Sequence, residues 1–125
     1  MHEFSNRELE KINIDESLVI GISWTGKQFQ DISISIDWCG QEDLKQEIDF
    51  INSTAKLCFE FVTDFECSFK FNPGTMGALE ITSFTFKAAG VFWAVEFTFK
   101  FYPVGYFKFN CNNFKFIVDR KPDQV

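Results

Sequence analysis

The side chains of this chain that could carry acid–base chemistry are three carboxylates in its central stretch. Glu60, Asp64 and Glu66 all occupy even positions, so in an extended chain they point to one side. Facing carboxylates of this kind can serve as general acid and base or bind a divalent cation. The same spacing is also typical of the solvated face of a sheet. We favour that interpretation because no further catalytic group accompanies them.

The histidine and the cysteines do not add a reactive centre. The only histidine is His2, near the start of the chain, whereas a catalytic base must be held within hydrogen-bond reach of its target. The four cysteines have no C-x-x-C spacing, which argues against a zinc site. The sequence has no Gly-rich phosphate loop, no EF-hand loop and no H-E-x-x-H motif. It therefore predicts a protein that is not an enzyme, with no catalytic residue, no metal and no cofactor.

The surroundings of the cysteines predict which thiols are accessible. Cys67 alternates with Phe65 and Phe69 and is expected to be a small core residue. Cys39, beside Gly40, is expected to be the most exposed thiol. Free thiols are typical of a reducing cytoplasm, and the even count of four leaves a disulfide open as the alternative.

Composition and charge exclude several classes of protein. The 125 residues suit one domain, 1–125, and 46% of them are hydrophobic, including 18 Phe. The formal net charge of −6 argues against a nucleic-acid binder and suits a basic partner. The first residues do not resemble a signal peptide, and no apolar run reaches about 18 residues, so we expect no membrane contact and a cytoplasmic location.

Alternation with a period of two runs through most of the chain and predicts β-strands. One polar and one apolar face per strand is typical of antiparallel sheets. We therefore expect a mainly β fold, an antiparallel sandwich or small barrel of about seven strands with one or two short helices. The expected strand segments are 18–24, 31–38, 57–71 with a bend near Thr63-Asp64, 78–87 with a β-bulge near Thr82-Ser83, 91–101, and 106–119 interrupted around 110–113.

Two short helices are expected beside the strands. Ser5 and Glu8 form a capping box, with Phe4 and Leu9 as a hydrophobic staple, which predicts a helix over about 6–12. A helical stripe of apolar residues predicts a second helix over 41–52. A polar loop followed by an early strand remains the alternative for that segment.

The Phe-rich stripes have two interpretations. Alternating Phe on neighbouring strands is typical of a sandwich core, which is the interpretation we favour. The alternative is a Phe-lined β-barrel that carries an apolar small molecule. The stripes lack polar anchors, and the only arginines, Arg7 and Arg120, lie near the two ends of the chain.

Several short motifs give a resemblance to a known family. They are Trp24-Thr25-Gly26, Phe29-Gln30-Asp31 with the alternating strand that follows, and the F-x-F-x-F-Y-P-x-G segment at 97–105. In these motifs the chain resembles small all-β immunity proteins of bacterial polymorphic or contact-dependent toxin systems. The resemblance implies a cytoplasmic protein that binds and neutralises a cognate toxin, often a nuclease.

The partner-binding candidates follow from charge. A toxin that attacks nucleic acid tends to be basic, so an inhibitor that covers it is expected to be acidic. An unpaired edge strand is a further route to association and could pair two copies of the chain. The candidate contact residues are Glu42, Asp43, Glu47, Glu60, Asp64 and Glu66.

Overall fold

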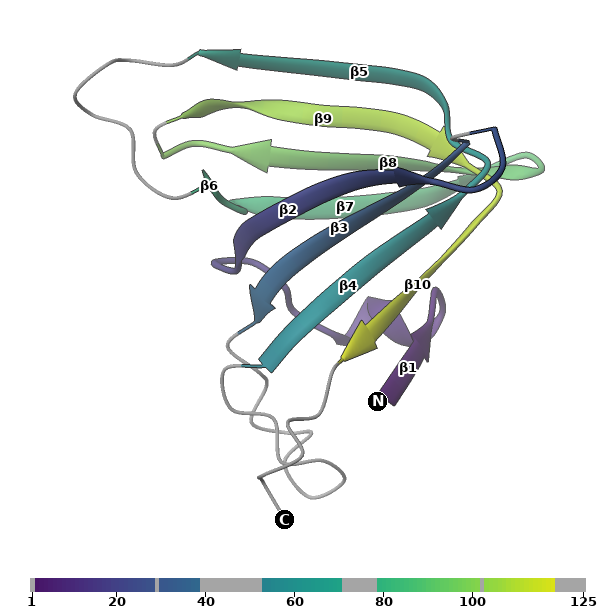
Figure 1. Cartoon of the computed structure of the whole chain (residues 1–125), viewed down its shortest axis with the longest axis horizontal. Coiled ribbons are helices and arrows are strands. Elements are labelled where there is room, and N and C mark those ends of the chain that lie inside the picture. The colour runs from purple at the N-terminus through teal and green to yellow at the C-terminus, as the bar shows by residue number, and fades with distance from the viewer. Residues whose placement is uncertain (1, 29, 39–52, 71–78, 102, 119–125) are drawn as a thin grey trace.

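The computed structural model describes residues 2–28, 30–38, 53–70, 79–101 and 103–118. These residues form ten strands and one short 3-10 helix, arranged as Figure 1 shows. The elements are β1 (His2–Ser5), η1 (Glu8–Lys11), β2 (Leu18–Thr25), β3 (Asp31–Trp38), β4 (Ser53–Glu60), β5 (Thr63–Lys70), β6 (Leu79–Glu80), β7 (Ser83–Ala89), β8 (Phe92–Phe99), β9 (Val104–Cys111) and β10 (Asn113–Val118).

The strands form two antiparallel sheets. Sheet A has the order β1-β10-β4-β3-β2-β6, and sheet B has the order β5-β9-β8-β7. In Figure 1 the two sheets meet at the right of the view and diverge toward the left. The predicted mainly β, antiparallel fold is confirmed, and the arrangement is an open sandwich rather than a closed barrel.

The chain passes between the sheets at the places where the sequence pattern breaks. The bend expected near Thr63-Asp64 separates β4 in sheet A from β5 in sheet B, and the interruption around 110–113 separates β9 from β10. The β-bulge expected near Thr82-Ser83 is wrong, because at this point the chain leaves one sheet and enters the other. Residues before it pair with β2 in sheet A, and residues after it pair with β8 in sheet B. The parity slips there because the chain changes sheet.

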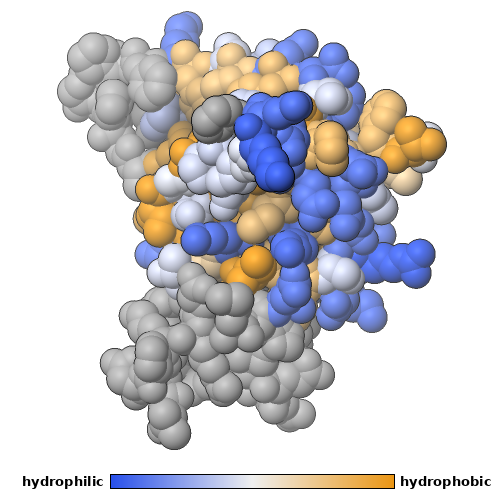
Figure 2. All heavy atoms as spheres, turned by 45° about the vertical axis from the view of Figure 1, so that its right-hand side comes forward, coloured by the Kyte–Doolittle hydropathy of each residue, from blue (hydrophilic) through white to orange (hydrophobic). Residues whose placement is uncertain are grey.

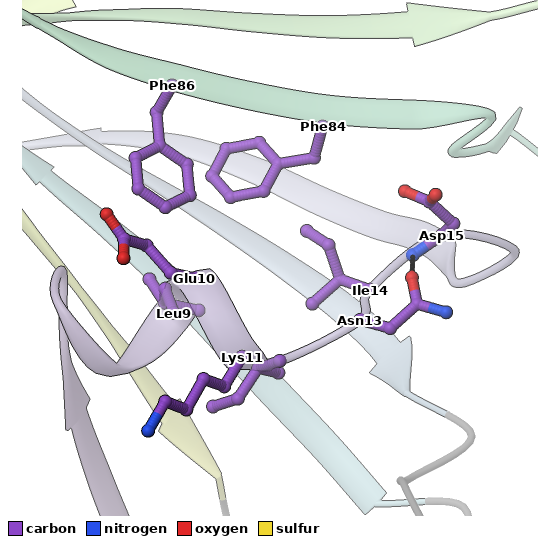
Figure 3. A pocket seen from close by; sticks show the side chains of 9 residues that line it. Leu9, Glu10, Lys11, Asn13, Ile14, Asp15, Phe84 and Phe86 are labelled. Atoms are coloured by element: carbon purple, nitrogen blue, oxygen red, sulfur yellow. Dashed lines mark hydrogen bonds between the residues drawn. The ribbon is translucent and has the colours of Figure 1, made fainter.

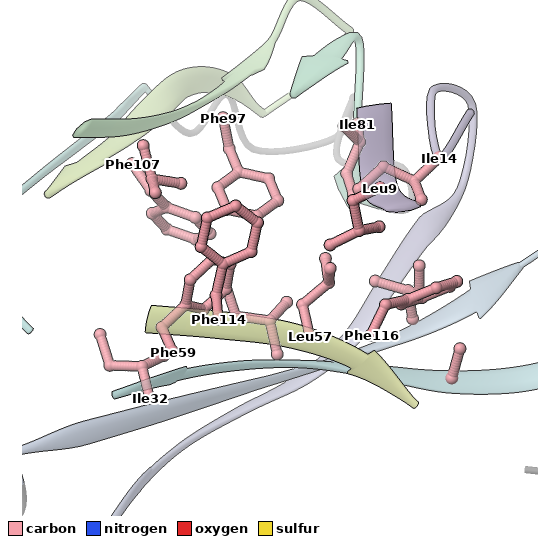
Figure 4. Packing of buried hydrophobic residues seen from close by; sticks show 14 of the residues in the cluster. Leu9, Ile14, Ile32, Leu57, Phe59, Ile81, Phe97, Phe107, Phe114 and Phe116 are labelled. Carbon is pink, nitrogen blue, oxygen red and sulfur yellow. The ribbon is translucent and has the colours of Figure 1, made fainter. Parts of the chain in front are cut away.

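The core is built from aromatic rings of both sheets. Phe59 of β4 is fully buried, and its ring centroid lies 4.9 Å from that of Phe109 and 5.6 Å from that of Phe114. Phe97 of β8 joins the same group at 6.0 Å from Phe59, so rings from both sheets meet (Figure 4). Aromatic pairs in such edge-to-face and offset arrangements add about 0.5–1.5 kcal/mol each beyond the area they bury.

The N-terminal segment covers one side of the sandwich. β1 pairs with β10, and Leu9, Ile12 and Ile14 that follow it are buried. The helix expected over 6–12 is reduced to the single 3-10 turn of η1, since short helices need more support than one capping interaction. Half of the capping box is present: the Ser5 backbone N–H donates to Glu8 Oε1 at 3.1 Å. We call Leu9, Ile12 and Ile14 the covered flank.

The helix expected over 41–52 falls on a part of the chain that lies outside the described residues. Over the described ranges, no helix combines the length and apolarity needed to cross a membrane.

Candidate functional site

The side of the sandwich opposite the covered flank exposes apolar side chains at the free edge of β2. β2 pairs with β3 along its whole length but with β6 only at Leu18 and Val19. On that edge the backbone from Ile20 onward has no neighbouring strand among the described residues. The exposed fractions are 58% for Ile20, 42% for Ile22 and 44% for Trp24.

β5 forms the facing edge, in sheet B. It pairs with β9 alone in the described structure, and Figure 1 shows it at the upper boundary of the molecule. Phe65 of β5 meets Trp24 of β2 with ring centroids 5.4 Å apart, so the two sheet edges touch at this point. Phe65 is 36% exposed, although its ring also stacks on Phe109 at 5.7 Å. We call Ile20, Ile22, Trp24 and Phe65 the open flank.

The alternation predicts that the apolar side chains of β2 point toward the core and are buried there. The predicted direction is largely confirmed, but the predicted burial is wrong. Ile22 and Trp24 lie opposite the buried Ile34 and Ile32 in the sheet register, so both point to the core side. They remain exposed because no described strand covers them on their other side. The register shifts between Val19 and Gly21, which places Ile20 at an irregularity rather than in the predicted alternation.

The same correction applies to Cys67 of β5. It lies opposite the buried Phe107 and so faces the core side, as predicted, but its thiol is exposed rather than buried. The reason is that β5 is an edge strand. Partial burial nevertheless raises the pKa of the Cys67 thiol above its ordinary value.

The other described thiols are less accessible. Cys111 is buried, and burial together with the nearby charge of Glu60 raises its pKa to about 12. Cys58 is half-buried, and all three thiols are free. Cys39, expected to be the most exposed, lies outside the described residues. A thiol with a raised pKa holds little reactive thiolate at neutral pH, so neither Cys67 nor Cys111 has the setting of a nucleophile.

The carboxylates selected from the sequence are exposed but divided between the sheets. Glu60 ends β4 in sheet A, whereas Asp64 and Glu66 lie on the outer face of β5 in sheet B. Asp64 Oδ2 accepts a hydrogen bond from Asn110 Nδ2 at 3.1 Å, and Glu66 lies opposite Lys108 in the register. The three carboxylates therefore do not converge on one enclosed site.

The remaining acidic candidates, Glu42, Asp43 and Glu47, lie outside the described residues. Their role as partner contacts stays a prediction. Across the described part of the chain, no group of three or more His, Cys, Asp and Glu side chains is placed to hold a metal ion.

A strained aromatic residue lies at the turn between β4 and β5. Phe61 has a φ of +52°, in the left-handed region that residues other than Gly rarely adopt, and its side chain is 59% exposed. Two hydrogen bonds hold this turn against the start of β3. The Phe61 N–H donates to Asp31 Oδ1 at 3.1 Å, and the Val62 N–H donates to the Gln30 carbonyl at 2.8 Å. Strained positions fixed in this way occur preferentially at functional sites.

Exposed apolar residues also occur away from the open flank. Val91 is 90% exposed in the turn between β7 and β8, and Phe101 is 61% exposed after β8. Both ends of the predicted apolar stripe at 91–101 are thus outside the core, whereas Val95, Phe97 and Phe99 are buried. Figure 2 shows hydrophobic side chains reaching the surface in several separate places on the face that it presents.

One pocket of about 300 Å³ lies beside the covered flank. Phe84 and Phe86 of β7 point toward Leu9 and Ile14, as Figure 3 shows, and the charged side chain of Glu10 lies at the rim. Asn13 Oδ1 accepts a hydrogen bond from the Asp15 N–H at 3.0 Å and closes the adjoining turn. The pocket is open to solvent and holds no buried polar group that would orient a ligand.

A second pocket, of about 590 Å³, lies on the outer face of sheet B. Its lining includes Ala94 and the charged side chains of Lys87, Glu96 and Lys108. The charged side chains alternate in sign across neighbouring strands, since Glu96 lies opposite Lys108. Such a surface is typical of a solvated sheet face.

The Phe-lined barrel of the alternative interpretation is not formed by the described strands. The sheets stay open along β2 and β5, and the inward Phe rings contact one another instead of lining a lumen. The rings of Phe97 and Phe84, for example, lie 4.6 Å apart.

The comparisons with known proteins returned no match: no family model fits the chain, and no curated protein or solved structure resembles it significantly. The functional assignment therefore depends on the molecule's own surfaces. Sequence reasoning missed the exposure of Ile20, Ile22 and Trp24. No signal for it was present in the sequence: the segment from Leu18 to Gly26 contains no charged residue, which is typical of a buried strand.

Proposed function

We propose that the protein is a binding protein that neutralises a cognate basic bacterial toxin by direct contact. The observation that carries the proposal is the uncharged edge of β2, which no described strand pairs beyond Val19, with the apolar side chains of the open flank exposed beside it. The resemblance to immunity proteins suggests a nuclease as the type of toxin and the cytoplasm as the place of action.

Beyond the irregularity between Val19 and Gly21, the free edge of β2 carries, among the described residues, little of the protection that natural edge strands usually have. Exposed edges are commonly blunted by charged side chains, proline or a covering segment, because unpaired backbone groups recruit other chains. From Ile20 to Thr25 the strand has no charge and no proline. A partner that binds this edge would satisfy the free backbone groups and bury Ile22 and Trp24.

The side chains of the open flank suit a protein partner. Energetically dominant interface residues are commonly large aromatics that become fully buried on binding. Trp24 and Phe65 are already in contact, so their rings offer a preformed anchor whose ordering costs little further entropy.

Charge supports a basic partner. The net charge of −6 attracts a basic protein over a distance and accelerates the encounter. Asp64 and Glu66 lie on β5, the strand that also carries Phe65, so two carboxylates border the open flank. A toxin that acts on nucleic acid needs a basic surface to bind phosphates, and an acidic protein bound there blocks access.

Co-expression tests this function. The candidate partner is the basic domain encoded by the reading frame adjacent to this gene, produced with and without the present chain. We expect the chain to restore growth and to co-purify with that domain. If no neighbouring frame encodes a basic domain, or if the chain neither binds it nor protects the cell, the proposal is wrong.

Matched variants locate the contact. Trp24→Asp and Ile22→Asp are expected to weaken partner binding at least about tenfold, as loss of central interface residues does. Val91→Asp is the control, because Val91 is also exposed and apolar but lies in the β7–β8 turn. Equal losses for all three variants would place the contact elsewhere.

A further inference from the structure

The free edge of β5 differs from that of β2 because its outer face carries charges of both signs. Of its eight residues, seven are exposed and Phe69 is half-buried. Its partner on one side is β9, and no described strand lies on the other side. The unpaired N–H and C=O groups of such a strand form a template for another strand.

The regular part of this edge is short and well defined. The register with β9 shifts between Thr63 and Glu66, and Asp64 has a φ of +54°. From Glu66 to Lys70 the pairing with β9 is continuous. A strand added to the free edge would therefore find its regular template in this five-residue segment, because a bulge disturbs pairing beyond it.

Gly105 contributes to the close approach of β9 and β5. A Cβ at this position would overlap the Ser68 carbonyl oxygen and come within 2.9 Å of Phe69 Cα. The glycine thus lets the backbones pack tightly opposite Ser68 and Phe69. It fixes the middle of the β5 edge against sheet B.

The charges along this segment are arranged so that a second, antiparallel copy of the same segment is complementary to it. Glu66, Ser68 and Lys70 point to the outer face, in the order acidic, neutral, basic. In an antiparallel pair of two identical strands, a twofold axis through Ser68 sets Glu66 of each copy opposite Lys70 of the other. Oppositely charged pairs and Ser–Ser pairs at directly opposed positions stabilise antiparallel strands.

Other registers do not satisfy these charges. An axis through Glu66 sets the two Glu66 carboxylates against each other, and an axis through Lys70 does the same for the ammonium groups. An axis through Cys67 sets Lys70 opposite Asp64. That carboxylate lies at the bulge, and its Oδ2 already accepts a hydrogen bond from Asn110. The axis through Ser68 is the one that pairs both charges of the regular segment.

We propose that two copies of the chain associate through antiparallel pairing of β5, with a twofold axis at Ser68. The two copies of sheet B then form one continuous sheet in the order β7-β8-β9-β5, followed by the same strands in reverse. On the inner face, Cys67 of each copy lies opposite Phe69 of the other. The net charge of −6 opposes the approach of two copies, and the two Glu66–Lys70 pairs offset this repulsion locally. The dimer uses the free edge of β5 and not the free edge of β2, which carries the proposed toxin binding, although Phe65 and Glu66 of β5 border both surfaces.

Charge reversal with rescue tests the dimer in the full-length chain. Sedimentation equilibrium should show a concentration-dependent dimer for the unaltered protein. Glu66→Lys alone and Lys70→Glu alone set like charges opposite each other and should each weaken the dimer roughly tenfold or more. The double variant should recover the dimer, because the charges are then complementary again.

A matched control separates this effect from net charge. Glu10→Lys makes the same charge change on the exposed η1 segment, away from β5, and should leave the dimer intact. A monomer at all concentrations, or a double variant that stays as weak as the single ones while its circular dichroism spectrum is unchanged, overturns the proposal.

Cross-linking tests the register. Directly opposed residues of antiparallel strands have Cα atoms about 4.5–5.5 Å apart, which a disulfide can span. Ser68→Cys, made together with Cys67→Ser and Cys39→Ser, should give a cross-linked dimer under mild oxidation with diamide. The absence of this cross-link, or a dimer of the otherwise unaltered chain cross-linked through Cys67, would overturn the Ser68-centred register. Open-flank variants at Ile22 and Trp24 should leave the dimer unchanged, so failure of one proposal can be told from failure of the other.

Discussion

The two flanks of the sandwich are both lined by large apolar side chains, but those side chains differ in how far they are covered. On the covered flank, Leu9 and Ile14 of the N-terminal segment are each 2% exposed. On the open flank, Ile22 and Trp24 are 42% and 44% exposed, although they also point to the core side. The apolar character of a side chain thus determines the side to which it turns, and a second segment determines whether it is buried.

This difference in exposure determines whether an apolar side chain contributes mainly to the stability of the fold or remains available for binding. A residue that is already buried contributes its transfer free energy to folding, about 25 cal/mol for each Å² of apolar surface removed from water. A residue left exposed retains part of that free energy for association with another molecule. We therefore expect substitutions on the covered flank to lower stability and substitutions on the open flank to lower binding.

The largest contrast is expected between two phenylalanines, one at the centre and one on the open flank. Phe59→Ala removes a fully buried ring and should lower the free energy of unfolding by about 3–5 kcal/mol. Phe65→Ala should cost less than half as much, because its ring is partly solvated already. Urea denaturation followed by circular dichroism measures both. Equal costs would mean that the open flank is as enclosed as the core.

Two isoleucines give the same comparison with side-chain type held constant. Ile14→Ala should cost about 2–5 kcal/mol because it leaves a cavity where the N-terminal segment packs against the core. Ile22→Ala should cost less than about 1 kcal/mol, since little of its apolar surface returns to water and no closed cavity forms. Thermal unfolding of both variants provides the measurement, and a larger loss for Ile22→Ala would contradict the assignment of the two flanks.

Much of the fold was predictable because local alternation fixes strand direction. The breaks at Thr63-Asp64 and at 110–113 were visible as interruptions of the pattern, and both became passages between sheets. The passage after Leu79–Glu80 was interpreted as a bulge, because a parity slip looks the same whether one strand bends or the chain changes sheet.

The candidate site was predictable only in part, for a physical reason. The outward direction of Asp64 and Glu66 follows from strand parity, and the structure places both on an exposed face. The exposure of Cys67 and Trp24 depends on which strand ends a sheet. That is a long-range property of strand order, and alternation within one strand carries no information about it.

A smaller change in stability is expected at Phe61, in the strained turn between β4 and β5. Phe61→Gly removes a side chain from a left-handed backbone position and should raise the free energy of unfolding by roughly 0.5–1 kcal/mol. Phe61→Ala keeps the Cβ and should leave stability nearly unchanged. Chemical denaturation of the two variants distinguishes strain from lost contacts: a marked loss with Phe61→Gly would mean that the ring is held by packing.

The smallest effect is expected at the outer edge of the side that the N-terminal segment covers. Lys115 Nζ lies 3.0 Å from Glu3 Oε1, and both side chains are largely solvated, at 40% and 56% exposed. Solvent screening limits such a pair to about 0.2–1 kcal/mol, so Glu3→Gln should cost a few tenths of a kcal/mol. High salt should reduce the cost further.

The pH dependence of this ion pair follows from the lysine. The hydrogen bond that Lys115 donates to Glu3, and then the charge of Glu3, raise the pKa of Lys115 above the ordinary lysine value of 10.5. The contribution of the pair is therefore fully present below that ordinary value, and it is lost as the pH rises through the higher pKa of the folded protein. The stability difference between the unaltered protein and Glu3→Gln should thus be constant at neutral pH and vanish in strongly alkaline solution. A difference that persists there would show that β1 is held to β10 by backbone pairing and packing around Glu3 rather than by its charge.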